Sequence, residues 1–376
     1  MIYLDNAATT YPKPKTVLDE TVKCISDYCG NPGRGSHFMS RAAGEAIYEC
    51  REKLAGMFGA VDPSLCIFTL NTTYALNFAL KISVKRGDHI LISDMEHNSV
   101  YRQVIKLNNE GFASFDIFKT IGCDSNQIIN NIIKKIKCNT KILICQLASN
   151  ICAHFMPVTK IGKICRANGI KFIADAAQSA GILEVNVSDM NIFALCLPSH
   201  KGLYGPQGTG AAIFSDPGVK YLPTFIEGGS GSNSLSFFMP DDLPDRYEAG
   251  TLPTPAIAGL CRGLEYISNI GIREIRERER DLAYLLYSEL KNDNNYVVYG
   301  NFPEYGIVLF NDKRYVSTRV SEELDRMGIC LRAGFHCAPL AHKTLNTGPS
   351  GAVRASFGLF NKKSEVYSLL DALKKI

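Results

Sequence analysis

Lys141-Ile142-Leu143-Ile144-Cys145-Gln146 and Ile170-Lys171-Phe172-Ile173-Ala174 are two nearly continuous apolar runs, separated by a helical pattern over Thr159–Asn168 that Gly169 closes. Strands that are covered on both faces have this nearly continuous apolar character. The same alternation of short apolar runs with helical patterns extends from residue 60 to residue 215. It predicts an α/β fold with a mostly parallel sheet that is flanked by helices on both faces.

The chain changes character between residues 228 and 255, where glycines, serines and prolines mark a long ordered loop. Beyond this loop, helical patterns over 256–290 precede short apolar runs near 296–298 and 306–310 and then further helices. Strands that are separated from helices in this way indicate an α+β arrangement. We therefore expect a large domain over residues 15–255 and a smaller α+β domain formed by residues 1–14 and 256–376.

The composition is typical of a soluble globular protein, with 46% apolar and 21% charged residues in a chain of 376. The 41 basic and 37 acidic residues leave a net charge of +4 that is spread along the chain, which argues against nucleic-acid and membrane partners. No apolar run reaches the length of a membrane span, and residues 1–6 lack the pattern of a signal peptide. The 13 cysteines have no framework spacing, so we expect reduced thiols and a cytoplasmic location.

Four polar segments each follow a predicted strand of the large domain, and the carboxyl ends of parallel strands meet at one edge of the sheet, where ligands bind. The segments are Asn71-Thr72-Thr73, Met95-Glu96-His97-Asn98, Asp175-Ala176-Ala177-Gln178 and Ser199-His200-Lys201-Gly202.

Each segment has a chemical and a structural interpretation. Lys201 can form a Schiff base with an aldehyde, and Asp175 can keep a pyridine nitrogen protonated. Thr72 and Thr73 can bind a phosphate at a helix N-terminus, and the ring of His97 can stack on a cofactor. Taken singly, the lysine is as readily a solvated surface residue, and the others are helix caps or a structural histidine. Together they indicate a site for pyridoxal phosphate (PLP).

Three further segments, Tyr3-Leu4-Asp5-Asn6-Ala7-Ala8-Thr9-Thr10, Glu248-Ala249-Gly250-Thr251 and Val353-Arg354-Ala355-Ser356-Phe357-Gly358, extend the pattern over nearly the whole chain. With them, the sequence resembles the cysteine desulfurases and selenocysteine lyases of the class V branch of PLP fold type I enzymes. The resemblance implies conversion of L-cysteine to L-alanine, a persulfide on Cys337 and sulfur transfer to an acceptor protein. It leaves the pathway open among iron–sulfur cluster assembly, tRNA thiolation and selenium delivery.

The resemblance also implies a role for individual residues. Lys201 would carry the cofactor, Gln178 would contact the ring oxygen beside Asp175, and His97 would stack on the ring as a catalytic residue. Thr251 would reach the phosphate of a partner subunit, which implies a homodimer. The remaining implied ligands are Thr72, Thr73, Ser199 and His200 for the cofactor and Asn150 and Arg354 for the substrate carboxylate, which a planar guanidinium suits.

Cys337 lies in Arg332-Ala333-Gly334-Phe335-His336-Cys337-Ala338-Pro339, a short loop of the group II type. Positive charge from Arg332 and His336 favours a thiolate there, although a buried structural cysteine is the alternative. A metal site made from Cys330, His336, Cys337 and His342 is a weaker alternative because its spacing matches no standard zinc pattern, so we expect no metal.

Three departures from the family pattern bear on the site. Pro198 stands where the family has a phosphate-binding hydroxyl, so either Ser199 takes over this contact or the phosphate has one donor fewer. Phe335 replaces a histidine that group II members often carry, and Cys152-Ala153-His154 replaces small polar residues.

Several functions stay open from the sequence. They are a selenocysteine lyase acting on L-selenocysteine, another PLP-dependent C–S lyase, an aminotransferase, and a catalytically impaired scaffold of the same fold. A nicotinamide-dependent dehydrogenase is disfavoured because no Gly-x-Gly-x-x-Gly turn follows Ile67-Phe68.

Overall fold

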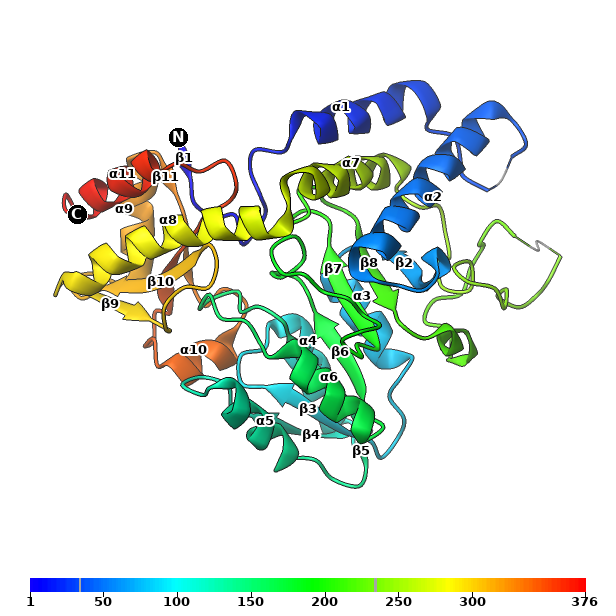
Figure 1. Ribbon diagram of the computed structural model, residues 1–376, viewed down its shortest axis with the longest axis horizontal. Helices are drawn as coiled ribbons and strands as arrows, with labels where there is room; N and C mark the ends of the chain where they lie inside the picture. The colour runs from blue at the N-terminus through cyan, green and yellow to red at the C-terminus, as the bar shows by residue number, and fades with distance from the viewer. Residues whose placement is uncertain (34, 233–234) are drawn as a thin grey trace.

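A sheet of seven strands forms the centre of the computed structural model, which describes residues 1–33, 35–232 and 235–376 (Figure 1). Four neighbouring pairs are parallel, and β8 alone runs antiparallel to both of its neighbours. In spatial order the strands are β2 (Cys66–Thr69), β8 (Gly210–Phe214), β7 (Ala194–Pro198), β6 (Lys171–Asp175), β5 (Thr140–Gln146), β3 (His89–Ser93) and β4 (Ser114–Phe118). The mostly parallel α/β sheet that the sequence predicts is thereby confirmed.

Helices cover both faces of this sheet. Leu143 and Cys145 of β5 belong to one apolar core, and Ile142 and Ile144 belong to the other, because successive side chains of a strand point to opposite faces. The first core is completed by α2 (Phe38–Phe58), α5 (Ser125–Ile133), α6 (Val158–Ala167) and α7 (Thr254–Ile270); the second is completed by α3 (Thr72–Lys81) and α4 (Asn98–Asn109). Helix α1 (Lys15–Lys23) packs on α7.

The remaining chain forms a smaller layered unit with its own core. Its antiparallel sheet has the order β12 (Arg332–Gly334), β13 (Ala352–Ser356), β10 (Ile307–Asp312) and β9 (Tyr296–Tyr299). This sheet packs against α8 (Ile272–Asn292), α9 (Ser317–Arg326) and α11 (Lys363–Leu373), and α10 (Pro339–Leu345) follows the cysteine loop. Figure 1 shows the long α8 running from α7 into this unit, which also holds both termini.

The N-terminal segment joins the smaller unit through backbone pairing. Strand β1 (Ile2–Tyr3) runs parallel to β11 (Ile329–Cys330), and Leu4 shares the core of the smaller unit. Helix α7, in contrast, contributes its buried side chains to the core of the large sheet. The packing of α7 favours a domain boundary near Gly271, later than the boundary at residue 256 that the sequence suggests, and we keep this division as a proposal. Among the described residues, none of the helices has both the length and the apolar character needed to cross a bilayer.

Candidate active site

A small cavity of about 100 Å³ opens at the carboxyl edge of the large sheet, where the sequence predicts a ligand site. All four predicted polar segments contribute to it, from the ends of β2, β3, β6 and β7. The lining residues are Asn71, Thr72, Thr73, His97, Ser99, Gln146, Ala148, Asn150, Asp175, Ala177, Gln178, His200 and Lys201.

Lys201 follows β7 and lines this cavity. Burial, reinforced by the guanidinium of Arg354, lowers the pKa of the amine to about 8, and Asp175 opposes the shift. A neutral amine is a nucleophile and a base, so this lysine is suited to bond an aldehyde and to move a proton.

Asp175 is the last residue of β6 and is 2% exposed. Its Oδ1 accepts a hydrogen bond of 2.8 Å from the backbone N–H of Ala177. Burial raises the pKa of this carboxyl group, while the Ala177 N–H and the charge of Lys201 oppose the rise. A cationic nitrogen in the cavity would also lower the pKa of Asp175, so the carboxylate and a protonated heterocycle would stabilise each other.

His97 is the N-cap of α4 and its ring is neutral. The Nδ1 atom accepts from the backbone N–H of Ser99 at 3.1 Å, which leaves the proton on Nε2. Burial and the charge of Lys201 lower the pKa of the imidazole to about 4. A neutral, flat ring at the cavity wall is suited to stacking.

The phosphate-binding group that the sequence predicts is only partly brought together. Thr72 and Thr73 start α3 and line the cavity with His200, whose Nδ1 is buried with no hydrogen-bond partner in the described part of the chain. Ser199 is not among the residues that line the cavity, and its hydroxyl, which also has no partner among the described residues, lies against Gly205, where an added Cβ would come within 2.1 Å of it. The cofactor contact that the resemblance implies for Ser199 therefore stays a prediction.

The N-terminal segment holds the lysine loop from the other side. Thr10 Oγ1 donates to the carbonyl oxygen of Lys201 at 3.0 Å, and Lys13 Nζ donates to that of His200 at 2.8 Å. Gln178 Nε2 donates to the carbonyl of Ala7 at 2.9 Å, so one N–H of its amide is already used. These contacts fix the loop that carries the amine.

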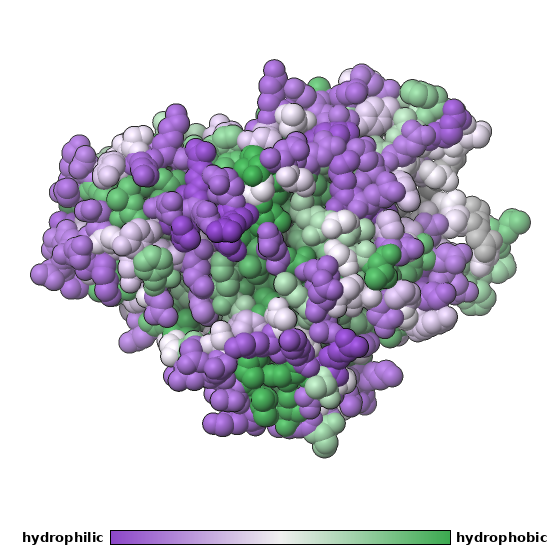
Figure 2. Space-filling view, viewed as in Figure 1, coloured by the Kyte–Doolittle hydropathy of each residue, from purple (hydrophilic) through white to green (hydrophobic). Residues whose placement is uncertain are grey.

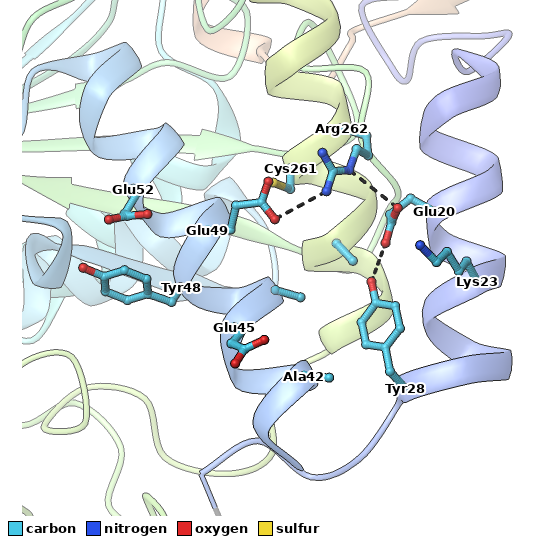
Figure 3. Close-up of a pocket in the computed structure, with 12 residues that line it drawn as sticks. Glu20, Lys23, Tyr28, Ala42, Glu45, Tyr48, Glu49, Glu52, Cys261 and Arg262 are labelled. Carbon is cyan, nitrogen blue, oxygen red and sulfur yellow. Dashed lines mark hydrogen bonds and ion pairs between the residues drawn. The ribbon is translucent and has the colours of Figure 1, made fainter. Parts of the chain in front are cut away.

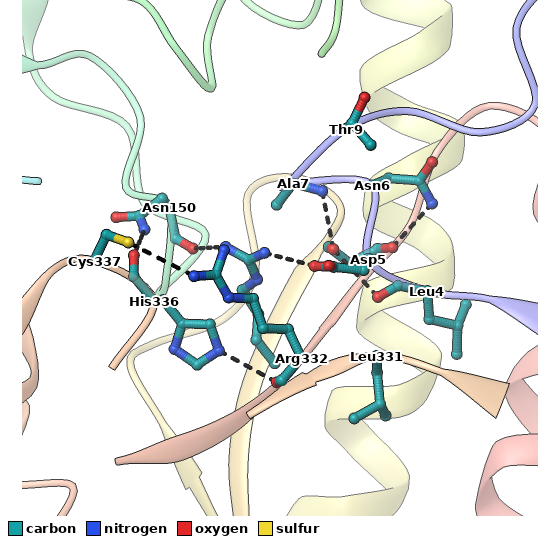
Figure 4. Close-up of polar contacts among 12 residues, drawn as sticks. Leu4, Asp5, Asn6, Ala7, Thr9, Asn150, Leu331, Arg332, His336 and Cys337 are labelled. Atoms are coloured by element: carbon teal, nitrogen blue, oxygen red, sulfur yellow. Dashed lines mark hydrogen bonds and ion pairs between the residues drawn. The ribbon is translucent and has the colours of Figure 1, made fainter. Parts of the chain in front are cut away.

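Cys337 is exposed and sits in a backbone conformation that few residues adopt. The φ angles of His336 and Cys337 are 48° and 56°, in the left-handed region that costs a residue with a Cβ about 1–2 kcal/mol. The carbonyl of Cys337 accepts from the backbone N–H of Asn98 at 2.7 Å, next to His97. Arg332 Nη2 lies 3.6 Å from the sulfur, and Figure 4 shows this guanidinium pointing at the thiol. The loop thus presents an exposed thiol beside a cation, and its backbone is bonded to the residue that follows His97.

Arg354 and Asn150 lie together between the two units. Arg354 is 1% exposed, donates to the Asn150 carbonyl at 3.0 Å and to Asp5 Oδ1 at 2.7 Å, and keeps its Nε without a partner among the described residues. Asn150 Nδ2 donates to the His336 carbonyl at 2.9 Å, a contact that Figure 4 shows beside Cys337. Asn150 lines the cavity, whereas Arg354 stands behind it. Arg354 Nε is therefore a free donor near the place of the predicted substrate carboxylate, whereas the unpartnered atom of Asn150 is Oδ1, an acceptor, among the described residues.

Thr251 lies outside this cavity within the described chain. It lines a separate hollow whose walls come from residues 31–33, 44–51, 230–232 and 244–252, where Asn31 Nδ2 lies 3.5 Å from its hydroxyl. The role that the sequence assigns to Thr251 involves a second subunit, so it stays a prediction.

A further hollow between α1, α2 and α7 is lined by acidic side chains (Figure 3). Here Glu49, Cys261 and Glu265 form the one group with metal-ligand spacing in the described chain. Its carboxylates are already paired: Lys53 contacts Glu49 at 2.6 Å and Glu265 at 3.0 Å, and Arg262 contacts Glu265 at 2.6 Å. This group is therefore an ion-pair network.

The sequence interpretation missed some of the residues at the site. Gln146 ends β5 and lines the cavity, and its position as a polar residue at a strand end was a usable signal. Glu96 is fully buried beneath His97, accepts hydrogen bonds from Ser93 and from the Gln146 N–H, and has its pKa raised to about 8 by burial.

Comparisons with known proteins agree with this geometry. The chain matches the family model for class-V aminotransferases over residues 2–369. A probable cysteine desulfurase from Methanothermobacter thermautotrophicus and another from Pyrococcus abyssi are each 31% identical to it, over 100% of this chain and 94% of the relative.

Solved structures agree as well. The apo structure of a cysteine desulfurase from Thermococcus onnurineus NA1 has a TM-score of 0.91 at 30% identity and covers 100% of this chain and 94% of its own. The Escherichia coli cysteine desulfurase CsdA has a TM-score of 0.89 at 24% identity, covering 99% of this chain and 94% of its own, and supports the fold alone. The predicted fold and the resemblance to cysteine desulfurases are confirmed.

Proposed function

Because this chain belongs to the class-V aminotransferase family, we propose that it is a PLP-dependent cysteine desulfurase, which converts L-cysteine to L-alanine and takes the sulfur onto Cys337. One observation carries the proposal: Lys201 and Asp175 share a cavity to which the exposed Cys337 is tied by the Asn98 N–H. The names of the relatives that are 31% identical support it.

The residues present fit pyridoxal phosphate. His200 Nδ1 is buried in the cavity lining without a partner among the residues described, which suits a phosphate oxygen or a hydroxyl of a ligand. Thr72 and Thr73 add hydroxyls at the N-terminus of α3, where the helix dipole favours an anion. Asp175 would hold the pyridine nitrogen, Gln178 the ring oxygen and Lys201 the aldehyde carbon.

When bound, this cofactor supplies an electron sink for the bond between Cα and its hydrogen. The protein supplies the rest of the chemistry. Lys201, whose amine has a pKa of about 8, accepts the α-proton of cysteine and returns a proton to the product. Arg354 and Asn150 would orient the substrate carboxylate, and neutral His97 would cover the ring.

Cys337 is the proposed sulfur acceptor. Its thiolate attacks the sulfur of the substrate, the Cβ–S bond breaks, and the bonding electrons pass to carbon, so that alanine leaves once carbon has been protonated. Arg332, 3.6 Å from the sulfur of Cys337, places a cation beside the attacking atom. Because Cys337 is exposed, its persulfide can pass to an acceptor protein, and iron–sulfur cluster assembly in the cytoplasm is the pathway that we propose.

A homodimer is part of the proposal. Leu235, Phe237 and Phe238 are 95%, 100% and 85% exposed on the loop that leads to Thr251, and Figure 2 shows apolar surface where this loop runs. Exposed aromatic and aliphatic side chains of this kind mark interaction surfaces. Covering them with a second copy would bring Thr251 to a neighbouring subunit, in keeping with its predicted contact with the partner's phosphate.

The test is the replacement of Cys337 by Ser. Alanine release from L-cysteine should be lost while the absorbance of the bound cofactor persists, and Cys138→Ser, at another exposed cysteine, should keep full activity. Normal turnover by the Cys337 variant would show that the sulfur acceptor is wrongly assigned. Parallel assays with L-selenocysteine and with a keto acid separate the proposal from a selenocysteine lyase and an aminotransferase.

A further inference from the structure

Two histidine rings lie edge to edge and nearly coplanar in the interior behind the cysteine loop. The rings of His336 and His342 have their centroids 5.3 Å apart with an interplanar angle of 13°, and the residues are 3% and 2% exposed. His336 Nδ1 is 3.1 Å from His342 Nε2. The outer nitrogens also have partners: His336 Nε2 lies 3.2 Å from the Arg332 carbonyl, and His342 Nδ1 lies 2.8 Å from Thr347 Oγ1.

The partners fix the direction of every hydrogen bond in this chain. A carbonyl oxygen only accepts, so His336 Nε2 carries a proton and its Nδ1 accepts when the ring is neutral. His342 must then donate from Nε2, and its Nδ1 accepts the hydroxyl proton of Thr347. Burial lowers the pKa of His336 to about 2 and of His342 to about 4, with Arg354 adding to both shifts, so both rings are neutral at physiological pH.

This hydrogen-bond chain ends on the backbone that shapes the cysteine loop. Its last acceptor is the carbonyl of Arg332, whose side chain reaches the thiol, and His336 is itself the first of the two left-handed residues. The other contacts of the loop, Asn150 to the His336 carbonyl and Asn98 to the Cys337 carbonyl, come from the large domain. Within the smaller unit, the hydrogen bond between the two histidine rings links His336 to α10. Strained residues persist only where their surroundings hold them on several sides.

We propose that His342 is a positioning residue for the sulfur acceptor: by donating to His336 Nδ1 it fixes the tautomer of His336 and so keeps Cys337 in the left-handed turn beside Arg332. The inference rests on the proposed function for its consequence in catalysis, but the geometry it describes does not depend on that activity. Phe335, 44% exposed, packs edge-on against His342 at 5.4 Å, so the side chain that replaces a family histidine covers the pair.

The experiment measures the alkylation rate of Cys337 by iodoacetamide at neutral pH in the cofactor-loaded protein, with peptide mass mapping. Cys29 and Cys138 are exposed elsewhere and serve as internal references in each sample. The variants are His342→Leu, which removes the donor, and His342→Gln, whose amide N–H can replace it. His89→Leu is the matched control. His89 is also a fully buried histidine, and its Nδ1 is hydrogen-bonded to Thr140 Oγ1 at 2.8 Å at the amino-terminal ends of β3 and β5, opposite the edge that carries the cavity.

Relative to the references, the Cys337 rate should fall about tenfold in His342→Leu, because an unsatisfied buried acceptor and a freed loop separate the thiol from Arg332. It should stay within about twofold of the wild-type rate in His342→Gln and in His89→Leu. An unchanged rate in His342→Leu, or an equal fall in the Gln variant, overturns the proposal. Should His342→Leu not fold, Thr347→Val, which leaves His342 Nδ1 without its donor, must slow the same reaction, and an unchanged rate there also overturns it.

Turnover separates this inference from the proposed function. With L-cysteine, His342→Leu should lose kcat by the same factor as the alkylation rate, while KM and the cofactor absorbance stay unchanged. If the wild-type protein lacked desulfurase activity, the proposed function would fail, and the alkylation series would still decide whether His342 positions the thiol.

Discussion

The amine of Lys201 should capture pyridoxal phosphate near neutral pH far faster than an ordinary lysine does. Burial lowers its pKa from 10.5 to about 8. Only the neutral amine attacks an aldehyde, so a lowered pKa raises the reactive fraction at every pH below the ordinary value. At about pH 7.5 roughly one quarter of an amine with this pKa is neutral, against roughly one thousandth of an unshifted lysine, a ratio of about 200.

The assay mixes apoprotein with pyridoxal phosphate over about pH 6 to 10, fixes the product with borohydride, and quantifies modified Lys201 by mass spectrometry. An N-acetyl-lysine amide treated in parallel removes the contribution of the ionisation of the cofactor itself. The rate for Lys201 should rise with pH through a midpoint near 8. Asp175→Asn should lower this midpoint, because the carboxylate of Asp175 raises the pKa of the amine. A wild-type midpoint close to that of the amide, or an upward shift in the variant, would refute burial as the controlling factor.

Three other changes test separate parts of the structure. Arg332→Gln should slow alkylation of Cys337 at neutral pH at least about tenfold because the cation 3.6 Å from the thiol is lost, and an unchanged rate would contradict that role. Arg51 and Glu248 form a buried ion pair through two hydrogen bonds of 2.8 and 2.9 Å, so Glu248→Ala should lower the free energy of unfolding in urea by about 3–5 kcal/mol by leaving Arg51 buried without its partner. The double variant Arg51→Met with Glu248→Leu should lose less stability, because it removes both charges. Equal losses in the two variants would contradict the argument. Ser199→Ala should leave the Kd for pyridoxal phosphate within about twofold of wild type by equilibrium titration, since the Ser199 hydroxyl lies against Gly205 and Ser199 does not line the cavity; a larger loss would identify Ser199 as a cofactor ligand.

The sequence predicts the cavity well because one rule governs it. Thr72, His97, Asp175 and Lys201 each follow an apolar run, and parallel strands bring the residues after their carboxyl ends to one edge. The apolar pattern does not predict the antiparallel direction of β8, since Gly210–Phe214 is as apolar and as buried as the parallel strands β5 and β6. Periodicity reports burial, and it carries no information on strand direction.

Side-chain direction at a chain reversal is also beyond the sequence. Ser199 is one residue past β7, and whether its hydroxyl faces the cavity or Gly205 depends on the turn that follows. The pairing of His336 with His342 depends on two left-handed residues in succession, a conformation that sequence statistics assign to glycine and asparagine. The direction of the Ser199 hydroxyl and the left-handed conformation of His336 and Cys337 are set by tertiary contacts, which local sequence patterns do not report.

The position of Cys337 relative to Lys201 follows from contacts that cross between the two units. Cys337 belongs to the chain of the smaller unit, yet the carbonyl groups of His336 and Cys337 accept hydrogen bonds from Asn150 and Asn98 of the large domain. Helix α10 is tied in the same direction, because Thr344 Oγ1 donates to the Asp94 carbonyl at 3.2 Å. The thiol is therefore anchored to the same β3–α4 connection that positions His97. These anchoring contacts engage the backbone carbonyls of the cysteine loop, so they hold its backbone while the side chain of Cys337 stays exposed beside Arg332.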